Sequence, residues 1–318
     1  MTPSELLTVE SSEAEAVSSR PDGAHPGWLR AVWTELRPAQ WVKNFFVLAP
    51  LFFSPHAFSL DTLWRSLAAF GCFCAVSSSI YLLNDLVDCA QDRLHPEKRR
   101  RPLAAGRLPV GIAWTAAVGL AVAALSGGMA LSPSFAMVLT AYWGLNVLYT
   151  WRLKHVVILD VFVIAAGYLL RVIAGAVVID VMMSAWLLIC TTELALFIAV
   201  CKRRHEVTLL EEGARSHRQV LTDYPLPFLD AMIGILTASA LVSYTLYTVS
   251  DEIVARFGSP GLLLTVPFVL YGFFRYLYLV HHKEEGGDTT QSILTDRAML
   301  IDLGLWVATA GLILYGKG

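Results

Sequence analysis

Long apolar runs, separated by short charged segments, recur along most of this 318-residue chain. Hydrophobic residues make up 56% of the sequence and charged residues only 16%. A soluble domain averages roughly 45–50% apolar and about 25% charged residues. An apolar stretch of about 18 residues or more is typical of a helix that spans a bilayer. We therefore expect an all-α fold, a polytopic transmembrane helical bundle.

The apolar runs predict about nine membrane spans. They cover residues 42–58, 63–84, 108–131, 133–150, 156–180, 183–201, 229–250, 258–280 and 298–316. The first run is short and contains Pro50 and Pro55, so we expect a kinked or tilted segment. Residues 1–28 are polar, and they lack the basic and apolar regions of a cleavable signal peptide. We expect a disordered cytosolic tail there, followed by one transmembrane domain over residues 29–318.

Lysine and arginine collect on one side of the predicted bundle, in the N-terminal segment and in the loops after spans 2, 4, 6 and 8. The other side carries only Arg65, Arg256 and Lys317. Cytoplasmic loops of membrane proteins collect Lys and Arg. The sequence therefore predicts a cytosolic N-terminus, a C-terminus outside, and a polar site that faces the cytosol.

Asn84, Asp88 and Asp92 follow one another at intervals of four residues at the end of the second span. Each interval turns a helix by only about 40° and rises about 6 Å, so an amide and two carboxylates share one face. Asp85 lies about 100° away and could act from the side. Crowded carboxylates repel one another unless a cation lies among them, and Mg²⁺ prefers a few carboxylates together with water and substrate phosphates. Asn84, Asp88 and Asp92, called the ladder below, therefore predict a Mg²⁺ site.

Basic residues directly follow the ladder, at Lys98 and residues 99–101. They can donate to phosphate oxygens, although a basic run at a membrane boundary also serves topology alone. Lys43 and Asn44 near the start of the first span, and Lys202 at the end of the sixth, lie on the same predicted side. Each of these lysines taken alone is typical of a side chain that reaches for the interface.

A second polar cluster surrounds the loop after the fourth span. Asn146 and Tyr149 share a helix face, Lys154 lies in the loop, and Asp160 begins the fifth span. Arg171 lies deeper in that span, and an intramembrane arginine normally faces a polar cavity or an acid partner.

The partner of Arg171 is left open by the sequence. Asp160 lies eleven residues earlier on nearly the same face, so the two could form a pair that ties helices together. Glu193, inside the sixth span, could line the cavity or pair with Arg171 instead.

The ladder resembles the first aspartate-rich motif of the UbiA superfamily of intramembrane transferases, and the likeness extends from about Arg37 to the end of the chain. Where classical members carry an acidic pair in the second polar loop, this chain has Asn146, Tyr149 and Lys154, and then Asp160. This variant is similar to the decaprenyl-phosphate phosphoribosyltransferase branch. The segments that carry that similarity are residues 37–44, 84–99, 153–155, 167–171 and 202–206.

The resemblance implies transfer of 5-phosphoribose from 5-phosphoribosyl 1-diphosphate to decaprenyl (polyprenyl) phosphate, with release of diphosphate, a step toward lipid-linked arabinose for cell-wall arabinan. The cofactor would be Mg²⁺, and the partners would be the two substrates and the lipid bilayer of the plasma (inner) membrane. No nucleic acid is expected, and a homo-oligomer is left open. Catalytic roles fall to the ladder and Asp85. The expected substrate-binding residues are Lys43, Asn44, Tyr81, Lys98, Arg99, Arg101, Tyr149, Lys154, Asp160, Arg171 and Lys202.

Two other functions fit a chain of this kind. An aromatic polyprenyltransferase of the 4-hydroxybenzoate or haem type would hold one diphosphate and a nearly neutral ring, whereas phosphoribosyl transfer must hold three anionic groups. An anion transporter would place its buried charges near the middle of the bilayer. Here nearly all charges lie at one face, and only Arg171 and Glu193 lie deeper.

Substitution of a ladder carboxylate tests the metal prediction. We expect Asp88→Ala and Asp92→Ala each to abolish turnover, because the developing charge on the leaving diphosphate loses its cation. Membrane insertion should stay unchanged, as measured by the yield of protein extracted from the membrane fraction. Near-normal turnover in either variant would refute the metal assignment.

Overall fold

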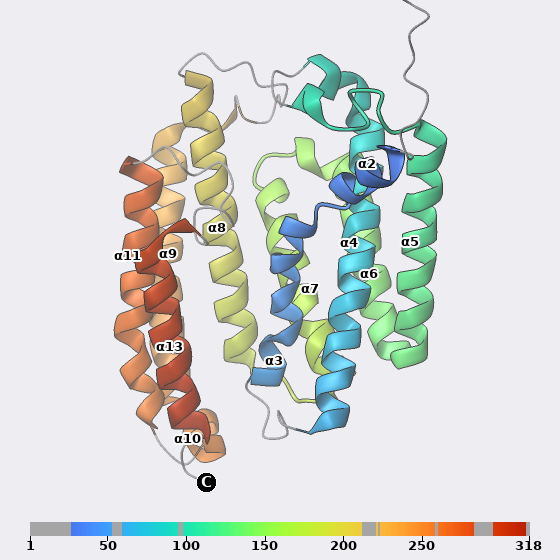
Figure 1. Cartoon of the computed structure of the whole chain (residues 1–318). Helices are drawn as coiled ribbons and strands as arrows, with labels where there is room; N and C mark the ends of the chain where they lie inside the picture. The colour runs from blue at the N-terminus through green and yellow to red at the C-terminus, as the bar shows by residue number, and fades with distance from the viewer. Residues whose placement is uncertain are drawn as a thin grey trace, which may run out of the picture.

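The structure, a computed structural model, describes residues 27–52, 59–94, 98–211, 221, 223–257, 260–282 and 295–315. The regular structure of these residues is helical, which confirms the all-α prediction (Figure 1). Of the predicted tail, only Gly27 and Trp28 are described, and they begin a helix. Residues 53–58 of the first predicted span also lie outside the described residues.

Nine segments of the described chain run along the bundle, in the order that the sequence predicts. The elements are α2 (Gly27–Glu35), η1 (Pro38–Leu48), α3 (Ala49–Phe52), α4 (Leu60–Leu94), η2 (Lys98–Arg100), α5 (Val110–Leu131), α6 (Pro133–Trp151), η3 (Leu153–His155), α7 (Leu159–Val178), α8 (Ala185–Glu211), α9 (Leu226–Val249), α10 (Asp251–Phe257), η5 (Pro260–Thr265), α11 (Val266–His282) and α13 (Arg297–Tyr315).

Seven of these helical segments are long and apolar enough to cross a membrane. The other two predicted spans are the η1–α3 segment, whose helices are short, and α6, in which tyrosine, tryptophan and Asn146 lower the hydropathy. Both nevertheless pack into the bundle beside α7. The chain is therefore an integral membrane protein.

The first span is irregular, where the sequence predicts a kinked or tilted segment, and Pro55 lies outside the described residues. It begins as a 3₁₀ helix, η1, and continues as the single α-helical turn α3. The carbonyl of Val47 in η1 approaches α7 at Gly175, where an added Cβ would lie 1.9 Å from that oxygen. Irregular backbone at membrane depth is tolerated where protein buries it. The missing side chain of Gly175 is what allows this close approach.

The helix α4 carries the ladder beyond the apolar part of its span. It has 35 residues, which corresponds to ~50 Å, whereas the hydrocarbon core of a bilayer is about 30 Å thick. Asn84, Asp88 and Asp92 therefore all lie in one continuous helix, as the four-residue spacing predicts. The end of the bundle at which α4 and α6 end and α7 begins is called the charged end below (Figure 1).

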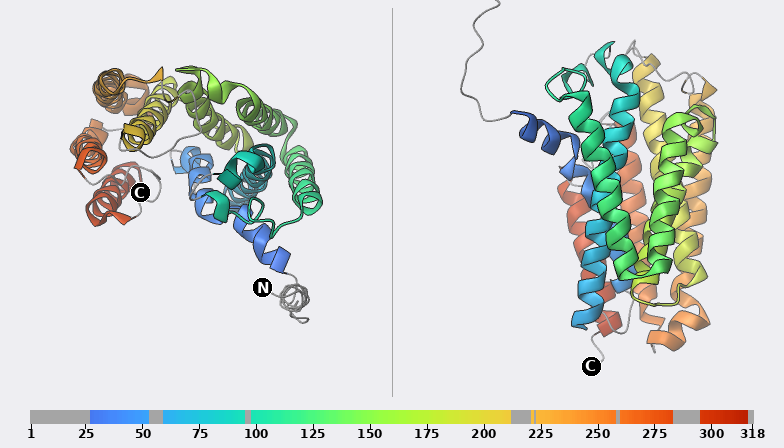
Figure 2. Two further views of the ribbon diagram at one scale, coloured as in Figure 1. Left: turned by 90° about the horizontal axis from the view of Figure 1, so that it is seen from above. Right: turned by 90° about the vertical axis from the view of Figure 1, so that its right-hand side faces the viewer.

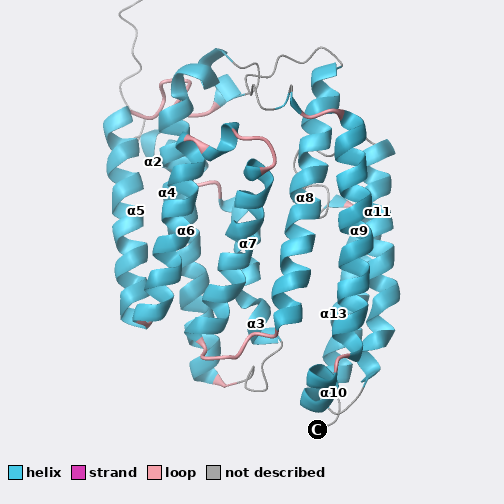
Figure 3. Ribbon diagram, turned by 180° about the vertical axis from the view of Figure 1, so that it is seen from behind, coloured by secondary structure: helices cyan, strands magenta, loops and turns pink. Residues whose placement is uncertain are grey.

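Two apolar cores meet at α7. One joins α7 to α8, α9 and α11 through residues such as Phe197 and Leu229. The other joins α7 to η1, α4 and α6 through residues such as Phe73 and Phe135. From above, the helices follow a curved arc, and from behind α7 lies between its two neighbouring groups (Figures 2 and 3). The helix α7 is therefore shared by the two cores.

Gly175→Ala tests the close contact between η1 and α7. The new methyl group would overlap the Val47 carbonyl, so we expect a destabilisation of about 2 kcal/mol and a lower Tm in detergent. Gly119→Ala in α5 is the matched control, since nothing lies within 4 Å of its added Cβ. Equal Tm values for the two variants would contradict the contact.

Candidate active site

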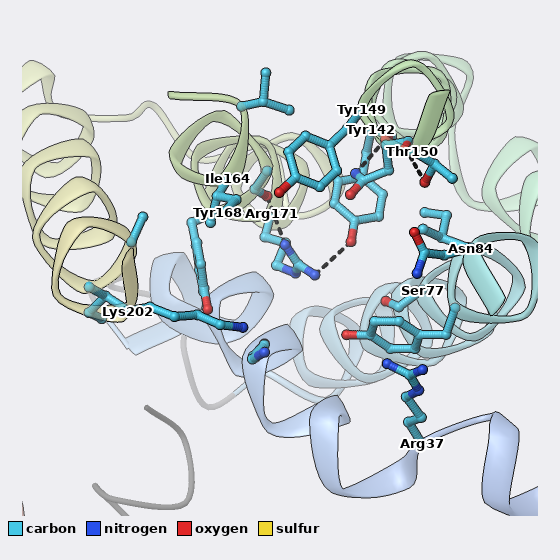
Figure 4. Close-up of a pocket in the computed structure, with 18 of the residues that line it drawn as sticks. Arg37, Ser77, Asn84, Tyr142, Tyr149, Thr150, Ile164, Tyr168, Arg171 and Lys202 are labelled. Carbon is cyan, nitrogen blue, oxygen red and sulfur yellow. Dashed lines mark hydrogen bonds between the residues drawn. The ribbon is translucent and has the colours of Figure 1, made fainter. Parts of the chain in front are cut away.

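A cavity of about 250 Å³ lies between η1, α4, α6, α7 and α8. Its wall is rich in cationic, hydroxyl and amide groups from helices far apart in the sequence (Figure 4). The polar lining residues are Arg37, Lys43, Ser77, Tyr81, Asn84, Tyr142, Asn146, Tyr149, Thr150, Tyr168, Arg171, Lys202 and Arg203.

Arg171 on α7 is the buried cation of this cavity, with 6% of the residue exposed. Its Nε donates to Oδ1 of Asn44 at 2.8 Å and its Nη2 to the Tyr142 hydroxyl at 2.6 Å, while Nη1 donates to the Gly167 carbonyl at 3.0 Å. The guanidinium also lies 4.6 Å from the centroid of the Tyr142 ring. All these partners are neutral, so among the described residues no carboxylate pairs with Arg171 and its positive charge is held in place without being cancelled.

The two pairings that the sequence left open for Arg171 are therefore wrong. Asp160 pairs with Arg203 of α8, whose Nε lies 2.6 Å from its Oδ2. Glu193 accepts a hydrogen bond from the Ser239 hydroxyl of α9 and is absent from the cavity wall. An arginine inside a membrane span thus faces a polar cavity, which is the other environment that such residues occupy.

The carboxylates at the end of α4 are each paired with a cation. Lys154 Nζ lies 2.7 Å from Oδ1 and 3.0 Å from Oδ2 of Asp88. Arg101 Nη1 bridges Asp92, at 2.6 Å, and Asp85, at 2.8 Å. The charged end therefore gathers loops that are distant in sequence onto one short stretch of helix.

Asp85 is more enclosed than its place beside the ladder suggests. Its side chain is 1% exposed, and Arg37 Nη2 lies 2.6 Å from both of its carboxylate oxygens. Arg37 has φ 53° and precedes Pro38, so the chain turns sharply between α2 and η1 at this residue. That turn brings Arg37, two residues after the end of α2, onto α4.

A buried acid adjoins this pair. Glu35 ends α2 with 2% of the residue exposed, and it accepts a hydrogen bond of 2.9 Å from the backbone N–H of Leu103. Burial, reinforced by the neighbouring Asp85 carboxyl, raises the pKa of Glu35 to about 7. Glu35 thus connects α2 to the loop that carries Arg101.

Asp160 lies behind the cavity wall. It is 0% exposed, and besides Arg203 it accepts a hydrogen bond of 2.6 Å from the Tyr224 hydroxyl. Arg203 in turn donates to the hydroxyl of Tyr149, which lines the cavity. The Tyr224 hydroxyl also accepts from the N–H of Ile158, whose φ is 69°. This buried set fixes the loop that carries Lys154.

The basic run after the ladder divides in two. Lys98, Arg99 and Arg100 form η2 and are exposed, whereas Arg101 reaches the carboxylates. Of the other expected substrate-binding residues, Lys43, Tyr81 and Lys202 line the cavity, and Asn44 is fully buried against Arg171.

Several residues at or beside the cavity were not among the site residues that the sequence predicts. Tyr142 belongs to the face of α6 that carries Asn146 and Tyr149, and the four- and three-residue spacing of these polar groups was a usable signal. Glu35, Ser77 and Tyr224 had no such signal. The contacts that link them to the site are made with residues at least 33 positions away, as in the hydrogen bond of Ser77 to Asn44.

The residues at the charged end fit a metal shared with a substrate. Among the described residues, no three His, Cys, Asp or Glu side chains are grouped as a protein cage for a metal. The ladder supplies an amide and two carboxylates, which leaves positions for water and phosphate oxygens, as Mg²⁺ prefers. The cations of Lys154 and Arg101 already stand against Asp88 and Asp92. The surroundings of Asp88 and Asp92 therefore already accommodate positive charge, as a metal ion would require.

Comparison with known proteins points in one direction. The model of the UbiA prenyltransferase family matches residues 44–295. The decaprenyl-phosphate phosphoribosyltransferase of Mycolicibacterium smegmatis is 32% identical over 96% of this chain and 98% of its own length. The enzyme of the same name from Corynebacterium glutamicum is 33% identical over 88% of this chain and 85% of its own.

A solved structure shares the fold. A UbiA homolog from Archaeoglobus fulgidus, bound to GPP and Mg²⁺, superposes with a TM-score of 0.67, at 18% identity, over 89% of this chain and 99% of its own. The helical arrangement around the cavity is thus one already known from membrane proteins.

The pKa of Glu35 predicts a pH effect on stability. This pKa is raised above its usual value of 4.5, so protonation of Glu35 stabilises the folded protein. That stabilisation is complete below about pH 4.5 and is lost as the pH rises through about 7. Between pH 5.5 and 7.5 the loss is roughly 2 kcal/mol. Glu35→Gln keeps a carbonyl for the Leu103 N–H, so its Tm should exceed that of the wild type increasingly as pH rises.

The control for this experiment is Asp61→Asn, which removes an exposed carboxylate paired with Arg65. Its Tm should follow that of the wild type at every pH. A constant difference in Tm between Glu35→Gln and the wild type from pH 5.5 to 7.5 would contradict the raised pKa.

Proposed function

The chain belongs to the UbiA prenyltransferase family, and on that premise we propose that it transfers 5-phosphoribose from 5-phosphoribosyl 1-diphosphate to a polyprenyl phosphate. Diphosphate is the leaving group. The relatives named decaprenyl-phosphate phosphoribosyltransferase cover nearly the whole chain and support decaprenyl phosphate as the acceptor. The product would be a lipid-linked phosphoribose on the way to the arabinose donor for cell-wall arabinan.

The observation that carries this proposal is the uncancelled charge of Arg171, at a distance from Asp88 and Asp92, the two carboxylates of the ladder. Asn44 joins Arg171 to Ser77, and Ser77 lies eleven residues before Asp88 on α4, which is ~16 Å along the helix. A diphosphate held at the ladder leaves this deeper cation for a second phosphate. Phosphoribosyl transfer supplies such a group, whereas a prenyl diphosphate would place an apolar tail beyond its only anionic group.

The positions of the residues suggest which anionic group each of them would bind. Asn84, Asp88 and Asp92 would hold the metal and the diphosphate, and Mg²⁺ when bound supplies positive charge to the departing oxygens. Lys154 and Arg101 lie at the same carboxylates and can donate to the diphosphate. Arg171 would bind one of the two remaining phosphates, and Lys43 and Lys202 reach the cavity from η1 and α8.

The reaction exchanges one C–O bond for another. The bond from carbon 1 of ribose to the diphosphate oxygen breaks, and a bond from carbon 1 to an oxygen of the lipid phosphate forms. Charge develops on the departing oxygens, where fixed cations stabilise it most. The acceptor phosphate is already largely ionised near neutral pH, because the second pKa of such a group is about 6. No protein base has to remove a proton.

We place the charged end and its site in the cytosol, with the C-terminus outside. Support comes from the excess of lysine and arginine at that end. The diphosphate donor is then met from the water side, and the lipid acceptor from the bilayer of the plasma membrane. Lys98, Arg99 and Arg100 of η2 are exposed at the same end. There they can guide an anionic donor toward the cavity.

One assay tests the proposal against its rivals. Purified protein in lipid nanodiscs receives labelled 5-phosphoribosyl 1-diphosphate, decaprenyl phosphate and Mg²⁺, and the lipid fraction is extracted. We expect label in the lipid, and none with Asp88→Ala. An unlabelled lipid fraction, with prenylated 4-hydroxybenzoate formed in a parallel reaction, would replace this function by aromatic prenyl transfer. Uptake of the labelled donor into sealed proteoliposomes without lipid labelling would indicate a transporter.

A further inference from the structure

The carboxylates that would hold a metal are already neutralised by the chain itself. The ammonium of Lys154 contacts both oxygens of Asp88, at 2.7 and 3.0 Å. The guanidinium of Arg101 lies 2.6 Å from Asp92. Both cations come from loops, η3 and the segment after η2, rather than from the helix that carries the ladder.

A metal ion that arrived alone would have to displace these cations. The Lys154 side chain is 8% exposed and the Arg101 side chain 26% exposed, so water replaces their carboxylate partners only in part. A buried cation that loses its partner is strongly unfavourable. A metal accompanied by diphosphate removes this obstacle, because the phosphate oxygens accept the donors that the carboxylates release.

We propose that Lys154 and Arg101 are exchangeable counter-ions. In the donor-free protein they neutralise Asp88 and Asp92, and they pass to the diphosphate oxygens when a divalent cation takes the carboxylates. The metal and the diphosphate therefore bind together, and each strengthens the binding of the other. The nature of the donor rests on the proposed function, whereas the competition between Lys154 and a metal ion does not.

The contacts differ in a way that suits exchange. Arg101 uses one nitrogen for both Asp92 and Asp85, so it keeps its contact with Asp85 when it leaves Asp92. Asp85 is also held by Arg37 and is 1% exposed, so it remains a fixed anchor. Lys154 has three donors on a flexible stem, which lets its ammonium turn from Asp88 toward a neighbouring phosphate without moving the backbone.

Metal binding without any donor provides the decisive measurement. Mn²⁺, a paramagnetic substitute for Mg²⁺, is titrated into the purified protein in nanodiscs, and free Mn²⁺ is followed by its electron paramagnetic resonance signal. We expect Lys154→Met to bind Mn²⁺ at least tenfold more tightly than the wild type, since Asp88 is then unneutralised. Arg101→Met should act in the same direction.

Two variants control for charge and for folding. Arg100→Met removes one positive charge from the neighbouring exposed turn and should change Mn²⁺ affinity less than twofold. Lys154→Arg keeps the positive charge and should stay near the wild-type affinity. An Mn²⁺ affinity of Lys154→Met equal to that of the wild type, with a Tm that shows intact folding, would overturn the proposal. If Lys154→Met does not fold, Arg101→Met decides on the same criterion.

Inorganic diphosphate tests the second half of the proposal. In the wild type, saturating Mg²⁺ should tighten diphosphate binding, measured by calorimetry, by more than tenfold, and in Lys154→Met by much less. An equal gain in both proteins would contradict the exchange. If the lipid is not labelled but the Mn²⁺ results are as expected, the phosphoribosyl donor is wrong and the counter-ion exchange is supported. If the lipid is labelled normally but Lys154→Met binds Mn²⁺ as the wild type does, the proposed function is supported and the counter-ion exchange is refuted.

Discussion

Three carboxylates at the end of α4 would repel one another at a membrane boundary, and the charged end is organised around preventing this. Arg37 comes from the turn after α2, Arg101 from the loop after η2, and Lys154 from the loop between α6 and α7. Each ion pair therefore fixes a different loop to the same helix. In a partly buried setting such pairs matter more than exposed ones, because water screens them less. The cluster thus brings α2, the basic loop and η3 to the same end of α4.

Arg171, inside the cavity, is held by neutral groups and not by ion pairs. Arg171 is surrounded by neutral acceptors and aromatic rings, so its geometry is fixed while its charge remains available. Close by, Arg203 lines the cavity and donates to Tyr149, while its partner Asp160 is fully buried. Neutralised carboxylates at the charged end, together with an uncancelled cation inside the cavity, suit a substrate that has more than one phosphate. This contrast is the physical basis for preferring a phosphoribosyl donor to a prenyl diphosphate.

Much of this arrangement was predictable from the chain alone. The apolar runs predict the order and approximate bounds of the helices, and the ladder spacing predicts a shared helical face because α4 continues to Leu94. Lys43, Tyr81, Tyr149, Arg171 and Lys202 do line one cavity. The partners of Arg171 were not predictable. Helical spacing placed Asp160 on nearly the same face, but residues eleven positions apart on one helix lie about three turns apart, too far for a direct contact. The roles of Glu35 and Tyr224 depend on loops docking across the bundle.

What the sequence by itself determined is the membrane-spanning helical bundle, its family resemblance and the place of the ladder on one continuous helix. These follow from hydropathy and from local helical periodicity, which act over a few residues. What only the tertiary structure decided is which cation meets which carboxylate. Asp88 and Lys154 are 66 residues apart, and Asn44 and Arg171 are 127 residues apart. Several lysines and arginines were equally suitable by type and by side of the membrane. Only the packing of the helices and loops against one another selects among them, because an ion pair or a buried hydrogen bond requires contact within about 3 Å.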